Sequence, residues 1–334
     1  MIGIARLAVT GLMAIMAMGT ARAEDPPKAR IGVLRLSSSA PVFIAQDKGY
    51  FREAGLEVEL KFFDAAQPIA VATTSGDVDF GVTAFTAGLY NLGGKGVLKV
   101  IGGMSREKPG YPLIGYFASN NAYVSGLKTP KDLAGKRVAM TQVGSSFHYS
   151  LGLLADKYGF KLADVKIVPL QSLSNAAAAL KGETVDAALL PISTARKLMD
   201  EGGAKFLGWV GDETPWQLGA VFAAPKTLAN KALVTKFLGV LAKADREYHD
   251  VILTAMKDGV APINDKTRPL LEIIAKYTNL PVEQVVGNCA YIDPDGKLDV
   301  KNVDNQIKWL QEQGFVDKGF DAEAIIAKDY VKAD

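Results

Sequence analysis

The sequence predicts an α/β protein made of two successive units, each built on a parallel sheet with helices on both faces. Runs of strand length, either continuously apolar or alternating, are followed in turn by longer helical patterns along most of the chain. A second series of this kind begins near residue 119, and the chain has enough residues for two hydrophobic cores.

Residues 1–23 have the layout of a secretory signal peptide. One early cation, Arg6, precedes an apolar stretch from Leu7 to Met18 and a small-residue ending, Ala21-Arg22-Ala23. The stretch is shorter than the roughly 20 residues that span a bilayer, which disfavours a membrane anchor. We expect cleavage near Ala23 and localisation in the periplasm.

In the first unit, strands and helices alternate, and turn residues mark where one element ends and the next begins. Ser37–Ser39 and Pro41 predict a helix start, because Pro fits the first helical turn. Leu56–Phe62 alternates strictly, as a half-buried strand does. The expected strands are Ile31–Leu36, Leu56–Phe62, Val78–Val82 and Lys99–Met104; the expected helices are Val42–Ala54, Gln67–Ser75 and Thr83–Leu92.

The second unit repeats the pattern. Thr129-Pro130-Lys131-Asp132 predicts a capping box, and Gly144-Ser145-Ser146 leads into a helix that runs to about Tyr158. The expected strands are Arg137–Gln142, Val165–Leu170, Val185–Leu190, Lys205–Val210 and Gln217–Ala223; further helices are Asn175–Lys181, Ser193–Glu201 and Lys231–Lys257.

Composition excludes several classes of function. Of 38 Lys and Arg, Arg6 and Arg22 fall in the predicted signal, which leaves 36 cations against 36 Asp and Glu. A charge balance near zero predicts no nucleic-acid partner. The lone Cys289 has no partner for an internal disulfide and is expected to be a small buried hydrophobe.

The sequence offers little for metal binding or catalysis. His148 and His249 lie a hundred residues apart, so no His/Cys cluster is present and neither metal nor cofactor is expected. Asp293-Pro-Asp295-Gly296 lacks the ligand series of a calcium loop and is interpreted as a turn. Ser145 and Ser146 near His148 leave open an exported enzyme, although no nucleophile signature surrounds them.

Small polar residues follow the strands at five places. In open α/β sheets, ligands bind at the carboxyl ends of strands, where helix N-termini present free N–H groups that suit an anion. We therefore expect a binding cleft rather than an active site. The turns are Ser37–Ser39, Thr83–Ala84, Gly144–Ser146, Ser172–Ser174 and Pro191–Thr194.

Three further side chains are candidates to line such a cleft. Phe147 and His148 stand in the first turn after Ser146, and Trp216 precedes a strand. Arg35, at the end of the first strand, offers a bidentate cation to an anionic ligand or forms an ion pair at the sheet edge.

Four ordered motifs resemble one known family. They are Ser39-Ala-Pro-Val-Phe-Ile-Ala-Gln-Asp-Lys-Gly-Tyr-Phe51 with Ala54–Leu60, Ser75-Gly-Asp-Val-Asp-Phe-Gly81, Leu133–Ala139 with Gly144–Tyr149, and Ala179–Ala187. The family is that of the ABC-transporter periplasmic proteins for alkanesulfonates, nitrate, taurine and thiamine precursors. Its yeast relatives that synthesise the thiamine pyrimidine use a Cys-rich motif, from which this chain departs.

The resemblance implies a type II periplasmic-binding-protein fold with two α/β lobes around a cleft. Crossovers near Phe117 and Val221 would make residues 24–117 plus 221–334 the first lobe and 118–220 the second. Carried over by position, the ligand turns are Ser38–Ala40, Thr83–Ala84, Gly144–Ser146 and Pro191–Ile192, with Ser172 beside them.

The implied function is capture of a solute by hinge closure and delivery to an ABC permease in the inner membrane. We expect a monomer and a small organic anion, either a sulfonate or an aromatic or aliphatic carboxylate. The alternatives are a thiamine-precursor pyrimidine or other heterocycle, the exported enzyme using His148, and a ligand-sensing module that docks on a receptor.

Overall fold

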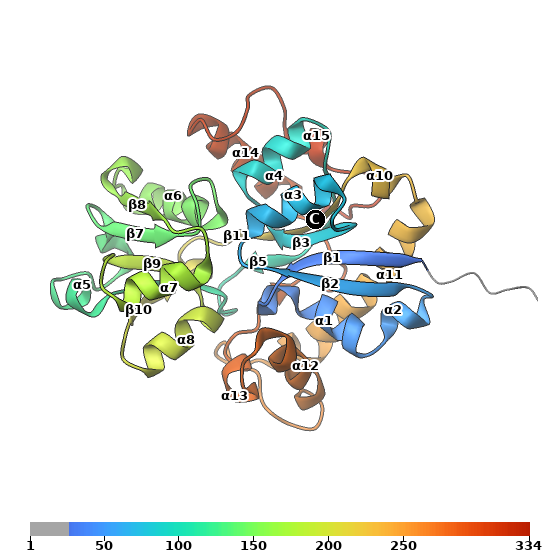
Figure 1. Ribbon diagram of the computed structural model, residues 1–334. Coiled ribbons are helices and arrows are strands. Elements are labelled where there is room, and N and C mark those ends of the chain that lie inside the picture. Colours follow the sequence, from blue (N-terminus) through green and yellow to red (C-terminus); the bar gives the residue numbers. More distant parts are fainter. Residues whose placement is uncertain (1–26) are drawn as a thin grey trace, which may run out of the picture.

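Two five-stranded sheets stand side by side in the chain (Figure 1). The structure is a computed structural model and describes residues 27–334, so the predicted signal peptide of residues 1–23 lies outside the described residues. The first sheet has the order β2-β1-β3-β12-β4. Its strands are β1 (Lys28–Leu34), β2 (Glu57–Phe63), β3 (Phe80–Ala84), β4 (Lys99–Gly103) and β12 (Gly219–Ala223).

The second sheet has the order β10-β6-β9-β7-β8. Its strands are β6 (Ile114–Ala118), β7 (Arg137–Met140), β8 (Lys166–Pro169), β9 (Ala187–Pro191) and β10 (Lys205–Trp209). All five come from one continuous stretch of sequence, whereas the first sheet takes β12 from beyond that stretch.

A small third sheet carries the chain between the two larger ones. It has the order β11-β5-β13, with β5 (Ser105–Glu107), β11 (Trp216–Gln217) and β13 (Tyr291–Ile292). The chain leaves the first sheet through β5 and returns to it through β11. The expected crossover residues Phe117 and Val221 lie a few positions further on, inside β6 and β12.

Helices cover both faces of each large sheet. Around the first sheet lie α1 (Ala40–Asp47), α2 (Tyr50–Glu53), α3 (Ala66–Ser75), α4 (Ala87–Gly94), α10 (Pro225–Leu228), α11 (Lys231–Val251), α12 (Arg268–Thr278), α13 (Val282–Val285), α14 (Val300–Glu312) and α15 (Ala322–Ile325). Around the second lie α5 (Asn120–Val124), α6 (Ser146–Tyr158), α7 (Leu173–Lys181), α8 (Ile192–Asp200) and α9 (Val210–Glu213).

The sheets are mixed, so the prediction of parallel sheets was only partly right. β12 runs antiparallel to β3 and β4, and β6 runs antiparallel to β9 and β10. Both strands are reached from the small third sheet rather than through a covering helix, and only parallel pairs need a long crossover. The remaining pairs of both large sheets are parallel.

Several predicted elements are shorter or divided. The helix expected over 42–54 breaks at Gly49, whose φ of 77° is left-handed and ends α1 before α2 begins. Thr83 and Ala84 belong to β3, and α4 starts only after its cap, Thr86. The strand expected over 217–223 divides at Leu218, whose N–H bonds to Ser105 of the third sheet.

Other predictions from the sequence are confirmed. The capping box of Thr129 and Asp132 forms, although the helix it starts is a single 3-10 turn over Pro130–Leu133. Cys289 is fully buried. The Asp293 carboxylate accepts the backbone N–H groups of Asp295 and Lys297, as the turn interpretation requires.

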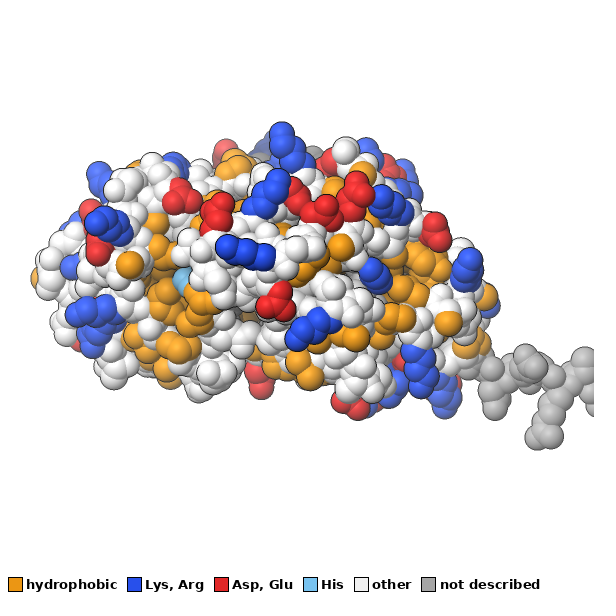
Figure 2. All heavy atoms as spheres, turned by 90° about the horizontal axis from the view of Figure 1, so that it is seen from above, with side chains coloured by type: hydrophobic (Ala, Val, Ile, Leu, Met, Phe, Trp, Pro, Cys, Tyr) orange, Lys and Arg blue, Asp and Glu red, His pale blue; other side chains and the backbone are white. Residues whose placement is uncertain are grey.

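Each large sheet has its own core, and the outer face of the molecule carries both signs of charge. Phe80 of β3 stacks on Phe237 of α11 at 3.9 Å between ring centroids, and Tyr116 of β6 is buried in the second core. Lys, Arg, Asp and Glu are interspersed on the face shown in Figure 2. Within residues 27–334, no helix is long and apolar enough to cross a membrane.

Candidate ligand-binding site

A cavity lies between the two large sheets, where strands of both end. Many of its residues end or follow β1, β2, β3, β7 and β9 or begin the next helices, which is where the parallel sheets were expected to present a ligand site. Others come from β5, the start of β6 and Leu218. The first sheet and its helices contribute Leu34, Leu36, Ser38, Ala65, Ala66, Gln67, Thr83, Ala84, Thr86 and Leu218, with Ser105 from β5. The second contributes Leu113, Ile114, Thr141, Gln142, Ser145, Ser146, Phe147, Leu173 and Pro191.

The first turn of α6 presents backbone donors to the cavity. Ser145 is the N-cap, and its hydroxyl accepts the backbone N–H of His148 at 3.4 Å. The N–H groups of Ser146 and Phe147 have no partner within the helix, because the first turn of any helix leaves its donors free. The α6 dipole adds a partial positive charge at the same place. An anionic group therefore fits at Ser146 and Phe147.

Polar side chains of the first sheet face the same space. The Thr86 hydroxyl accepts the N–H of Leu89 at 3.1 Å, so its proton goes to Oε1 of Gln67 at 2.5 Å. This arrangement leaves the Gln67 amide N–H₂ available as a donor. Gly88 makes room for it, because a Cβ there would lie 2.0 Å from Gln67 Nε2.

Thr83 carries a buried side-chain hydroxyl that is available to a ligand. Its side chain is 8% exposed, and its Oγ1 has no hydrogen-bond partner among the described residues. A buried hydroxyl without a partner costs free energy, which a ligand that bonds to it recovers.

Most of the rest of the lining is apolar, although Ser38, Ser105, Thr141 and Gln142 add further polar side chains. Leucine, isoleucine, alanine, proline and phenylalanine make up more than half of the residues, and none of them carries a charge. The cavity measures about 40 Å³, which is room for a few water molecules. A solute larger than this would enter only if the two sheets first move apart.

The structure brings seven of the fifteen predicted site residues into this lining. They come from four of the predicted turns and from both large sheets: Ser38, Thr83, Ala84, Ser145, Ser146, Phe147 and Pro191.

The other eight do not line the cavity. Ser39 and Ala40 start α1 and are buried in the first core, Ile192 is buried in the second, and Ser172 caps α7 through the N–H of Asn175. Gly144 donates its N–H to His148, and its carbonyl accepts the N–H of Ala87 at 2.8 Å. The remaining three are His148, Trp216 and Arg35.

His148 supports the site from behind. Its Nδ1 accepts the Gly144 N–H at 3.0 Å, and its ring packs against Trp309 and Phe315 with centroids 5.7 and 5.0 Å away. Burial lowers the pKa of His148 to about 4, so the ring is neutral at pH 7. The ring nitrogen nearest the loop is thus occupied by a backbone N–H and does not activate a serine.

Trp216 and Arg35 also have structural partners. Trp216 is 3% exposed and meets Tyr149 edge to face at 4.9 Å. Arg35 lies over the Phe62 ring at 3.7 Å and donates to the Tyr277 carbonyl. Its guanidinium lines a neighbouring hollow at the ends of β1 and β2.

The sequence reasoning missed thirteen lining residues of two kinds. Of the five polar ones, Gln67, Thr86, Thr141 and Gln142 stand at strand ends or helix starts, so the same signal that selected Thr83 would have found them. The fifth, Ser105, begins the short strand β5 and carries no such signal. The apolar ones show no pattern that separates a cavity wall from a core. The full set is Leu34, Leu36, Ala65, Ala66, Gln67, Thr86, Ser105, Leu113, Ile114, Thr141, Gln142, Leu173 and Leu218.

A larger hollow, of about 360 Å³, lies on the outer side of the first sheet. It is lined by β4, α11 and the C-terminal residues, and it includes the buried Asp245. No residue of the second sheet lines this hollow, so a ligand bound there would not contact both lobes. We take the smaller cavity between the sheets as the candidate site.

The fold matches solved periplasmic binding proteins along nearly the whole chain. The periplasmic aliphatic sulphonate binding protein SsuA from Escherichia coli superposes with a TM-score of 0.69 at 20% identity, covering 91% of this chain and 99% of that one. The periplasmic nitrate-binding protein NrtA from Synechocystis gives 0.67 at 14% identity, covering 90% and 85%. These likenesses confirm the two-lobed α/β fold of periplasmic binding proteins.

Sequence comparison then gives the family. Residues 37–248 match the family described as NMT1/THI5 like, and the chain belongs to it. It is 31% identical over 150 residues to the Taurine-binding periplasmic protein of Escherichia coli K12, a match over 44% of this chain and 43% of that protein. It is 25% identical over 316 residues to the Putative aliphatic sulfonates-binding protein of the same organism, covering 93% and 89%.

Proposed function

We propose that this chain is the periplasmic solute-binding component of an ABC importer and that it captures a small organic anion. The observation that carries the proposal is the cavity between the two lobes, where α6 N–H groups, the Thr83 hydroxyl and the Gln67 amide converge without a charged side chain. Similar proteins are named for taurine, aliphatic sulfonates and nitrate, which are all small anions or carry an anionic group.

Binding without catalysis is the better account of this site. The Ser145 hydroxyl caps α6 by accepting the N–H of His148. The His148 ring is buried behind the loop, and its Nδ1 accepts the N–H of Gly144. A serine nucleophile would need a base within hydrogen-bond reach of its hydroxyl. The neutral donors instead suit a ligand that is held and later released.

Export and closure complete the proposal. The predicted signal peptide would deliver the chain to the periplasm, where we expect it to act as a monomer with a membrane permease as partner. The lobes would be residues 24–117 plus 221–334 and residues 118–220, and they would hinge through the connections at β5 and β11. Donors from both lobes stabilise the closed state once the ligand bonds to them.

The first experiment is a thermal-shift screen with alkanesulfonates, aromatic and aliphatic carboxylates, nitrate and pyrimidines. A ligand at a hundred times its Kd stabilises the fold by about 2.7 kcal/mol, which raises the melting temperature measurably. We expect hits among the anions. A hit confined to pyrimidines would replace the anion with the heterocycle alternative.

Thr83→Val tests the site itself. The substitution keeps the shape and removes a hydroxyl that has no partner in the protein, so the melting temperature of the free protein should not fall. Affinity for the anion found in the screen should fall by about 10-fold or more, since a hydrogen bond to a charged group is lost. Ser145→Ala with Ser146→Ala should weaken binding as well, because the lost cap loosens the first turn of α6, whose N–H groups face the cavity.

Ser119→Ala is the matched control for the serine variants. Ser119 caps α5 as Ser145 caps α6, is equally buried, and lies outside the cavity lining. It should lower stability by about 1 kcal/mol through the lost cap and leave affinity unchanged. Unchanged affinity in both Thr83→Val and the double serine variant would refute this site.

A further inference from the structure

The charges around the cavity restrict which kinds of organic anion it can accept. None of the residues that line the cavity is Asp, Glu, Lys, Arg or His. The donors that suit an anion are all neutral: two α6 backbone N–H groups, the Thr83 hydroxyl and the Gln67 amide.

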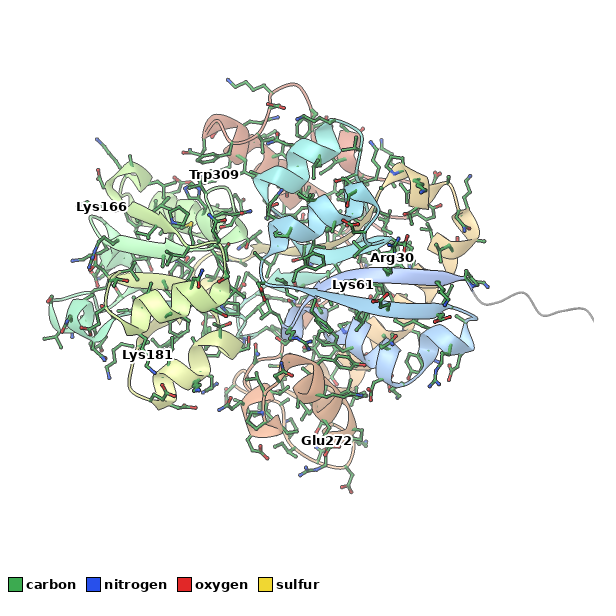
Figure 3. All side chains as sticks on the ribbon, viewed as in Figure 1. Arg30, Lys61, Lys166, Lys181, Glu272 and Trp309 are labelled. Carbon is green, nitrogen blue, oxygen red and sulfur yellow. The ribbon has the colours of Figure 1, made fainter. Side chains whose placement is uncertain are left out.

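The nearest charged side chains, Arg35 and Asp64, line a neighbouring hollow rather than the cavity, although the two spaces share Leu34, Leu36 and Leu173. Arg35 is bound to the Phe62 ring and the Tyr277 carbonyl, and Asp64 beside it lines the neighbouring hollow. Lys166, Lys181 and Glu272 lie at the periphery of the molecule (Figure 3). Among the described residues, the lining of the cavity itself therefore offers a solute no carboxylate.

Glu107 is the buried acid closest in sequence to the cavity, two residues after Ser105. It is 2% exposed, does not line the cavity, and pairs with Trp216 across the third sheet. Burial raises the pKa of Glu107 well above its ordinary value, which favours the neutral carboxylic acid. It is not available as the counter-ion of a ligand cation.

Apolar side chains of both lobes make up much of the remaining lining. Leu113, Ile114 and Leu173 of the second lobe, with Leu34, Leu36 and Leu218 of the first, would surround whatever part of the solute extends from its anionic group. An alkyl tail is stabilised there by removal from water. A tail that ends in an ammonium would bury a cation without a partner, which strongly disfavours binding.

We propose that the cavity accepts organic anions with one negative charge and an uncharged apolar tail, and that it rejects zwitterions whose tail carries an ammonium. Taurine, which names one relative of this chain, is such a zwitterion. The inference rests on the proposed function, because it concerns the solute of the same site.

Calorimetric titration of the full chain with ethanesulfonate, butanesulfonate, propionate and taurine tests the inference. Ethanesulfonate and taurine differ only by the ammonium group. The ratio of their binding affinities therefore isolates the effect of that group. We expect taurine to bind at least about 100-fold more weakly than ethanesulfonate. Equal affinity for the two would overturn the inference while leaving the proposed function intact. If none of the four binds, this inference fails, whereas the proposed function is decided by the wider screen of aromatic carboxylates and nitrate.

A gain-of-function variant provides the second arm. Leu173 is half-buried, lines the cavity and begins α7, a position where a helix favours an acid. Leu173→Glu supplies the missing counter-ion and should shift the taurine-to-ethanesulfonate affinity ratio by about 10-fold or more toward taurine. Leu173→Gln, with the same shape and no charge, should leave the ratio unchanged. A ratio that is the same in both variants would overturn the inference.

Discussion

One turn of α6 serves two sides of the molecule. Ser145 and Phe147 face the cavity, whereas His148, three positions after Ser145, faces Trp309 and Phe315 on the other lobe's C-terminal segment. The imidazole fixes the Gly144 backbone, and Gly144 precedes the two serines. The orientation of the ligand-facing loop therefore depends on a histidine that the ligand would not touch.

This arrangement predicts a specific pH dependence of stability. His148 has a folded pKa of about 4 against an ordinary value of about 6.5, so the unfolded chain takes up a proton more readily. The stabilising contribution is complete above pH 6.5 and is lost as the pH falls toward 4. Urea unfolding should give a lower free energy of unfolding at pH 5 than at pH 7. His148→Asn should reduce this slope of stability against pH.

His249→Asn is the control for that measurement. The chain has only these two histidines, and His249 sits beside Asp250 on the surface-exposed end of α11. Its variant should retain the slope. A slope that persists unchanged in His148→Asn would show that carboxylates, not this imidazole, set the pH response.

Sequence and structure agree best for residues whose role is local. Cys289 was predicted to be buried, and burial raises the pKa of its thiol to about 12. Asp293 was predicted to form a turn and does. Leu113 and Leu218, by contrast, line the cavity only because segments distant in sequence meet there, and nothing in their local pattern distinguishes them from core leucines.

At the scale of elements, a glycine sets how closely two helices approach. A Cβ at Gly152 of α6 would lie 2.0 Å from the Trp309 ring of α14, so this ring packs directly on the backbone of α6. Trp309 lies at this junction of the two lobes in Figure 3. The contact also holds the back of α6, whose front faces the ligand cavity.

Two helical glycines should respond oppositely to the same substitution. Gly152→Ala forces Trp309 to move and should destabilise the protein by about 1–3 kcal/mol, the usual effect of overpacking. Gly239 of α11 has open space where its Cβ would be, so Gly239→Ala should stabilise by about 0.5–1 kcal/mol through helix propensity. Chemical denaturation of both variants measures the difference. Destabilisation of equal size in both would contradict the close contact.

Each lobe holds its first parallel strand in the same way. Arg30 of β1 binds the Asp79 carboxylate through its backbone N–H and its guanidinium, and Arg137 of β7 binds Asp186 likewise. The partners are 49 residues apart in both lobes. These acids lie within two of the motifs on which the family resemblance was based, so part of that resemblance has a structural reason.

Removing either acid should lower stability. Asp79→Asn and Asp186→Asn each leave an arginine without its carboxylate and weaken the anchoring of a central strand, so both should lower the melting temperature. Glu201→Gln is the control, because its pair with Lys181 is exposed and such pairs contribute little. A melting temperature that stays constant in all three would show that the clamps do not stabilise the sheets.

At the scale of the whole molecule, the sequence predicted the α/β class and the two units but not how the chain joins them. Strand and helix periodicity identified most strands of the two large sheets and their main covering helices as far as α11. It did not identify β6 or α5, nor the separate helices that follow α11. The antiparallel direction of β6 and β12 depends on the small third sheet, whose strands β5, β11 and β13 are too short to show a period. The direction of these strands therefore depends on pairing between segments far apart in the sequence, which local patterns do not show.

Closure of the lobes should be visible in solution. Addition of a ligand from the screen should reduce the radius of gyration measured by small-angle X-ray scattering, because donors of both lobes favour the closed state. The double variant Ser145→Ala with Ser146→Ala should show no such reduction at the same ligand concentration. Identical scattering with and without ligand at saturation would mean that binding proceeds without hinge motion.

The place of β12 in the first sheet bears on the order in which the chain becomes able to fold. β12 lies between β3 and β4, yet it is synthesised after every strand of the second sheet. A nascent chain that ends before Gly219 therefore exposes the facing edges of β3 and β4, and open strand edges promote aggregation. Residues 114–209 already contain all five strands of the second sheet. The later lobe in the sequence is thus the first whose sheet can be completed.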